Sequence, residues 1–209
     1  GSFYEQFGNG LIFRAWEDRQ RGINNSLRGI RYKFNPSKEV QISGIHGKQR
    51  FGFEYSNSVI SGIDSNIDIS GILKLNNLGF NFGLSNLNRY QKLDAGFGEP
   101  ENVQIAGARF DLFYKDFYVN AELAKKGKDV IANEGEILSQ RKYDGTALQI
   151  DIGYSKKGLG INTSMRRLEN FNFYSDKLAE GNIYNQQTLS FVPALTCLLY
   201  TSPSPRDKR

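Results

Sequence analysis

Cysteine, histidine, tryptophan and methionine each occur only once in the 209 residues of this chain. A single cysteine excludes an internal disulfide framework and a multi-thiolate metal site. A single histidine, His46, excludes a multi-histidine metal site, and a Ser-His-Asp site would have to use this one residue. Long apolar runs are also missing, because no stretch approaches the roughly 18 residues of a membrane-spanning helix. The sequence therefore argues against a disulfide scaffold, a thiolate or multi-histidine metal site and a helical membrane span.

The C-terminal segment from residue 197 onwards differs from the rest of the chain. It begins with CLLYTSPSPRD, which resembles the in-frame translation of a sequencing-library adapter. We therefore expect residues 197–209 to be a non-native tail, and residues 1–196 to be a partial β-barrel domain truncated at both ends. Without the tail, 24 basic and 21 acidic residues remain, giving a net charge of +3, and no cysteine is left.

Alternation of apolar and polar residues is the strongest pattern present, and it is clearest in residues 66–87. Side chains of a β-strand point to opposite faces with a period of two, so this pattern predicts strands with one apolar face. The polar pair Asn76-Asn77 predicts a two-residue turn between the two strands. The apolar face would comprise Ile67, Ile69, Leu73, Leu75, Leu78, Phe80, Phe82 and Leu84.

The same period recurs along the chain and predicts about ten strands. Within residues 40–55 the apolar positions change sides, which predicts a β-bulge near Gly44 or Gly47. Loops are expected at 17–26, 88–102 and 126–144. The remaining strands are expected at 3–17, 27–34, 59–75, 78–87, 103–114, 117–125, 146–155, 159–168 and 188–192.

The predicted connections alternate between short and long. Residues 35–38, 76–77, 115–116 and 156–158 make tight turns, while most connections between them are several-fold longer. Long strands joined alternately by tight turns and large loops are typical of transmembrane β-barrels, and a soluble sandwich has no reason for this arrangement. The predicted fold is therefore all-β, an antiparallel up-and-down meander that forms part of an outer-membrane β-barrel.

Aromatic residues gather near the predicted tight turns. Membrane barrels place aromatic rings at the lipid–water interface, although aromatics also favour strands in general. Phe113 and Tyr118 lie in this region as well. The predicted interfacial girdle consists of Tyr32, Phe34, Phe80, Phe82, Tyr114, Phe117 and Tyr154.

Charged residues occupy the polar faces of the predicted strands. They could line a lumen that filters solutes, with a preference for anions, or they could form ion pairs that fill a small barrel. The sequence alone does not separate these two interpretations. The predicted lumen-lining residues are Arg31, Lys33, Asp68, Arg109, Asp111, Glu122, Asp151 and Arg166.

Motifs for catalysis, metals, cofactors or nucleic acids are not recognisable. Asp64, Asn66 and Asp68 imitate the start of a calcium loop, but the glycine and the distal glutamate of that motif are missing. The lysines before Gly158 do not form a phosphate loop, because the Gly-Lys-Ser/Thr ending is absent. Basic residues are dispersed, which argues against nucleic-acid binding. We therefore expect no enzyme activity, no cofactor and no metal.

Three stretches of the chain resemble one family. They are YEQFGNGLIFRAWEDR near the start, GYSKKGLGINTSMRRLENFNFYSD in the last third, and FVPALT just before the tail. The chain resembles an uncharacterised family of Bacteroidetes-type envelope proteins, known only as a domain of unknown function. The resemblance implies a longer parent chain in the outer membrane, with further closing strands after Thr196, and it supplies no activity or catalytic residues.

These observations predict a non-catalytic outer-membrane β-barrel protein with a porin-like or an envelope structural role. Its partners would be outer-membrane lipid, an unidentified small solute and unidentified envelope proteins. The alternative is a soluble extracellular β-sheet module that binds a ligand such as a glycan. A soluble module would pack its apolar faces on each other, whereas a barrel would expose them to lipid.

Overall fold

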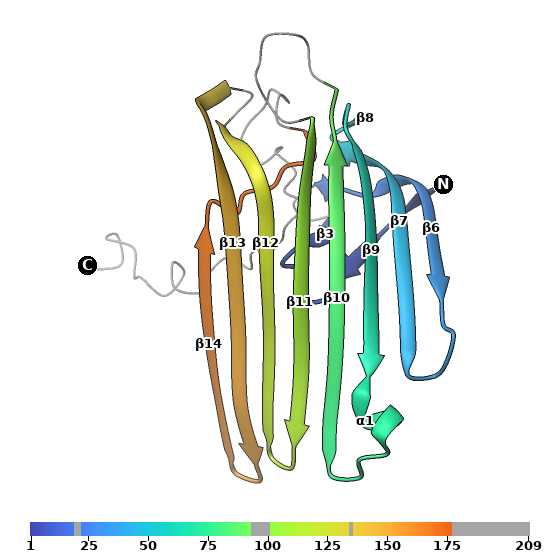
Figure 1. Ribbon diagram of the computed structural model, residues 1–209, viewed down its shortest axis with the longest axis vertical. Coiled ribbons are helices and arrows are strands. Elements are labelled where there is room, and N and C mark those ends of the chain that lie inside the picture. The colour runs from blue at the N-terminus through green and yellow to red at the C-terminus, as the bar shows by residue number, and fades with distance from the viewer. Residues whose placement is uncertain (19–21, 93–100, 134–135, 177–209) are drawn as a thin grey trace, which may run out of the picture.

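The computed structural model describes residues 1–18, 22–92, 101–133 and 136–176, and it consists almost entirely of antiparallel strands. One sheet of ten strands dominates the molecule (Figure 1), and two small two-stranded sheets accompany it. The elements are β1 (Ser2–Phe3), β2 (Glu5–Phe7), β3 (Phe13–Ala15), β4 (Glu17–Asp18), β5 (Ile23–Asn24), β6 (Leu27–Phe34), β7 (Val40–Phe51), β8 (Glu54–Tyr55), β9 (Val59–Asp68), α1 (Ile69–Leu73), β10 (Leu78–Tyr90), β11 (Asn102–Tyr114), β12 (Phe117–Asn133), β13 (Glu136–Lys156) and β14 (Leu159–Glu169).

Strands that follow one another in sequence are neighbours in the large sheet, as the alternation predicts. Its order is β1-β6-β7-β9-β10-β11-β12-β13-β14, and β8 pairs with β7. The all-β antiparallel meander is thus confirmed. The registers fix two faces, because residues paired across neighbouring strands point to the same side. We call the side that carries Ile60, Leu87 and Ile105 the inner face, and the opposite side the outer face.

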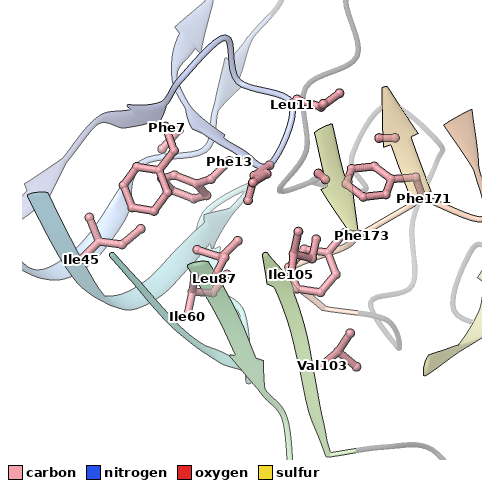
Figure 2. Close-up of a cluster of buried hydrophobic side chains, with 14 of the residues drawn as sticks. Phe7, Leu11, Phe13, Ile45, Ile60, Leu87, Val103, Ile105, Phe171 and Phe173 are labelled. Carbon is pink, nitrogen blue, oxygen red and sulfur yellow. The ribbon is translucent and has the colours of Figure 1, made fainter. Parts of the chain in front are cut away.

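The hydrophobic core lies on one half of the inner face. The chain from Phe7 to Ala15 packs there against side chains of β7, β9, β10 and β11, and the segment after β14 joins it. Figure 2 shows these two segments with Phe7 and Phe13 on one side and Phe171 and Phe173 on the other. The core side chains are 0–4% exposed. The core thus forms between the sheet and its own terminal segments.

The tight connections gather at one end of the sheet. β11 and β12 are joined by Lys115 and Asp116, and β13 and β14 are joined by two residues before Leu159. The β6–β7 connection and α1 lie at this same end, the lower end in Figure 1, which we call the tight-turn end. The opposite end, where β10 ends and β11 begins, is called the loop end. The predicted gathering of the tight turns at one end is confirmed.

The predicted turn at Asn76-Asn77 is wrong in its detail. β9 ends at Asp68, and residues Ile69–Leu73 form the short helix α1. The Asp68 side chain caps the helix by accepting the Gly71 N–H at 2.8 Å, and the Ser70 hydroxyl also donates to it. Local capping therefore overrides the alternating pattern.

None of the described residues belong to a helix with the length and apolar character that a bilayer crossing requires.

Three other predictions are wrong. No bulge lies near Gly44 or Gly47, because β7 pairs continuously with both β6 and β9. The strand expected over 40–55 instead ends at Phe51, and the chain turns at Gly52 (φ +58°) into β8. Residues 126–144 are mostly strand, and bulges in the β12–β13 pairing explain the broken alternation. Residues 3–17 do not form one strand but belong to the short strands β1–β4, and β2 and β3 pair as a hairpin. The expected strand at 188–192 and the boundary at 196 lie outside the described residues.

Candidate functional site

All eight residues predicted to line a lumen belong to the inner face. Their registers align Arg109 with Glu122, and Asp111 with Asn120, across β11 and β12. Pairing with β13 and β14 continues the same rows to Asp151 and Arg166. The period of two therefore assigns their common face correctly from sequence. Whether this face lines a passage stays a prediction.

An ion pair between Arg109 and Asp64 lies at the centre of the polar half of this face. Arg109 Nη1 donates to Asp64 Oδ1 at 2.7 Å, and Nη2 donates to Oδ2 at 3.0 Å. Nη1 also donates to the Ser85 hydroxyl at 2.8 Å. The two charged side chains are only 8% and 10% exposed. A Cβ on Gly83 would lie 2.5 Å from Arg109 Cζ, so a side chain at this position would displace the guanidinium group from its present place.

Glu122 connects this polar row to the N-terminal segment. Its Oε2 accepts the Asn9 N–H at 3.0 Å, and Asn9 Nδ2 donates to Asn120 Oδ1 at 2.6 Å. Gly8 adopts φ +53°, and a Cβ there would lie 2.8 Å from Arg109 Cδ. Among the described atoms, the second oxygen of Glu122 has no hydrogen-bond partner. The tip of the β2–β3 hairpin thus sits directly on the charged row.

Asp111 and Asp151 lie one step nearer the tight-turn end and accept hydrogen bonds from neutral groups. Asn120 Nδ2 donates to Asp111. Asp151 accepts hydrogen bonds from Gln149 Nε2 at 2.7 Å and from the Ser164 hydroxyl. This arrangement differs from the Arg109–Asp64 pair, since amides and a hydroxyl rather than a cation stabilise the carboxylates. The predicted preference for anions gains no support from this part of the face.

The remaining predicted residues are divided between two places. Arg31 and Lys33 on β6 form ion pairs with Glu5 at 3.5 and 3.3 Å. Asp68 is separate from the charged row and caps α1. The inner face therefore contains ion pairs and neutral hydrogen-bond networks side by side. Ion pairs are what the second interpretation expects, and the filtering of solutes stays a prediction.

Sequence reasoning missed a second buried polar group near the loop end. Arg89 is 1% exposed, lies 3.5 Å from the Asp129 carboxylate and donates to the Tyr174 carbonyl at 2.9 Å. Lys126 donates to the Asn172 carbonyl at 2.7 Å. These two cations fix the segment after β14 onto the sheet. Both residues fall in stretches that the sequence analysis expected to be loops, and their carbonyl partners, 85 and 46 residues away, left no local signal.

The seven predicted girdle residues all lie on the outer face near the tight-turn end. Phe117 and Tyr154 pair across β12 and β13, with ring centroids 4.6 Å apart. The neighbouring aromatics Phe113 and Tyr118 point to the inner face instead, because they occupy the opposite strand positions. Exposed apolar residues elsewhere on the outer face include Ile30, Ile63, Leu84, Phe110, Leu123, Ile152, Ile161 and Met165. We call these eight residues and the seven girdle residues the outer apolar band.

Carboxylates are distributed unequally between the two faces. The inner face carries Asp64, Asp111, Glu122 and Asp151. No aspartate or glutamate occupies an outer position within 27–34, 40–48, 59–67, 78–90, 102–114, 117–125, 146–154 or 159–167. Towards the loop end, outer positions carry the cations Arg28, Lys48, Lys125 and Arg167. Towards the tight-turn end, the described sheet has a polar inner face and an apolar outer band that its own chain leaves exposed.

Catalytic or metal chemistry finds no support in this geometry. His46 lies on the outer face, and its Nδ1 is 2.8 Å from the Ser61 hydroxyl. No described carboxylate forms a hydrogen bond with His46, as a Ser-His-Asp triad would require. Within the described ranges, no three acidic, histidine or cysteine side chains converge to hold a metal ion. The main feature of the described sheet is the contrast between its polar inner face and its exposed outer apolar band.

Comparisons with known proteins identify the family of this chain. A model of a family of unknown function, DUF6029, matches residues 1–199. Neither the curated proteins nor the solved structures gave a match. The match covers all three stretches on which the resemblance to an uncharacterised family depends. The chain therefore belongs to the DUF6029 family of unknown function.

Proposed function

We propose that this protein contributes a lipid-facing wall to the bacterial outer membrane, as part of a non-catalytic β-barrel. The observation that carries the proposal is the outer apolar band, which lacks carboxylates and which no segment of the described chain covers. Exposed apolar patches of this extent are rare on soluble monomers and mark sites of contact with other molecules or with a membrane. Apolar outer and polar inner positions alternate in membrane barrels in this way.

Of the two roles predicted for such a barrel, an envelope structural role is favoured over wide solute passage. The β2–β3 hairpin and the segment Phe171–Ser175 occupy the loop-end half of the inner face. Their buried aromatic and aliphatic side chains leave the polar row near Asp111 and Asp151 as the part of this face available to solutes. Any passage would therefore be narrow. We expect little or no steady conductance when the protein is reconstituted in planar bilayers.

A charge placed in the middle of the outer apolar band tests the membrane proposal. Leu84 lies near the centre of β10 and is 50% exposed. In lipid vesicles, Leu84→Arg should lower the free energy of unfolding by about 2–4 kcal/mol, because arginine at the midplane of a bilayer is poorly solvated. Unfolding in urea, followed by the fluorescence of the single tryptophan Trp16, measures this difference.

Asn86→Arg provides the matched control, since it introduces the same residue on the same strand and face, two positions nearer the loop end. We expect this change to cost about 1 kcal/mol or less, because the cost falls towards the interface. Equal stabilities of the two variants, together with folding in plain buffer without lipid or detergent, would contradict the proposal. That result would favour the soluble binding module.

A further inference from the structure

Each tight connection of the sheet contains lysine. The β6–β7 connection carries Lys38, the link from α1 to β10 carries Lys74, and the β11–β12 turn carries Lys115. Two more, Lys156 and Lys157, lie at the β13–β14 turn. We call these five residues the turn lysines. Glu39 and Asp116 are the acidic residues within the same connections, so the local balance is five cations against two anions.

The turn lysines have no carboxylate partners in the described part of the molecule. All five are exposed, and no ion pair joins any of them to an acidic side chain. Lys115 Nζ instead lies 5.2 Å from the ring centroid of Tyr114, a member of the outer apolar band. The uncompensated charge therefore lies at the tight-turn edge of that band.

Two turn lysines also occupy backbone positions that do not suit them. Lys74 has φ +53° and Lys115 has φ +52°, in the left-handed region that favours glycine or asparagine. Asn170 is the third non-glycine residue with positive φ in the described chain. Lysine at these two sites lowers the stability of the fold relative to glycine, and neither side chain forms an ion pair with a described carboxylate. A local folding requirement therefore does not explain these lysines.

We infer that the turn lysines bind the phosphate groups of anionic lipids at one surface of the membrane. This inference rests on the proposed function, because the band must enter lipid for the turns to reach the headgroups. Long basic side chains at the ends of membrane segments extend to the headgroup level, and each basic residue near an anionic surface contributes favourably to binding. The partner is thus a lipid phosphate at the tight-turn end.

The double variant Lys74→Gly/Lys115→Gly separates binding from folding, because the two effects have opposite signs. Its urea midpoint should rise, since glycine relieves the left-handed strain at both turns. Its affinity for vesicles of phosphatidylcholine mixed with phosphatidylglycerol should fall about 25-fold, or about fivefold for each lysine removed. Affinity for vesicles of phosphatidylcholine alone should not change.

Lys92→Gln is the matched control, since it removes an exposed positive charge near the loop end. Lys74→Arg/Lys115→Arg keeps the charge and should retain binding to phosphatidylglycerol. If the glycine variant and wild type bind the mixed vesicles equally, or if Lys92→Gln loses as much affinity per charge, the inference is overturned while the lipid-facing wall stands. Failure of the wild type to enter phosphatidylcholine vesicles would instead overturn the proposed function and, with it, this inference.

Discussion

Replacing Arg109 by alanine is expected to destabilise the protein by about 3–5 kcal/mol, because the change leaves a buried carboxylate without its cation. Asp64 loses both guanidinium hydrogen bonds, and Ser85 loses a donor. Glu122 stays beside the vacated space, with one oxygen already unpaired among the described atoms. Urea unfolding monitored by Trp16 fluorescence measures the loss.

Two comparisons make this prediction specific. Arg31→Ala removes a cation that is 42% exposed and pairs with Glu5 at 3.5 Å, so we expect a loss below about 1 kcal/mol. Asp64→Leu/Arg109→Met replaces both buried charges with apolar groups and should recover most of the stability lost in Arg109→Ala. If Arg109→Ala is no more harmful than Arg31→Ala, the buried pair does not hold the inner face together.

The faces of the sheet could be predicted from the sequence because they depend only on a period of two. Arg109 and Phe110 are adjacent in sequence, yet they fall on opposite faces as the alternation requires. That rule also separates Tyr114 and Phe117 on the outer face from Phe113 and Tyr118 on the inner face. The gathering of aromatic residues near the turns was a weaker guide to which face a residue occupies, because it includes all four of these residues although they lie on two faces.

Contacts between distant segments could not be predicted from the alternation. The Asn9 N–H meets the Glu122 carboxylate across 113 residues of sequence, and neither residue has a local signal for the other. The break of β9 at Asp68 depends on a cap that competes with strand pairing over only a few residues. The extension of β12 and β13 through residues 126–144 was missed because bulges disrupt the period on which the prediction relied.

The N-terminal β2–β3 hairpin connects the hydrophobic core with the charged row of the inner face. Its apolar side chains pack in the core, and its tip contacts the charged row. Phe7 and Phe13 are fully buried, and their ring centroids lie 5.4 Å apart. Its packing on the sheet is therefore expected to depend strongly on these rings.

Phe13→Ala should therefore lower the free energy of unfolding by about 3–5 kcal/mol, because it leaves a cavity between the hairpin and the sheet. Trp16 lies three residues further along, so a change in its emission before global unfolding would reveal release of the hairpin. Phe53→Ala is the control, since Phe53 is 98% exposed and its loss should cost less than about 0.5 kcal/mol. Similar costs for the two variants would show that the hairpin is not docked on the sheet. A large cost for Phe13→Ala alone would make the hairpin a fixed part of the inner face, which is the condition for the narrow passage proposed above.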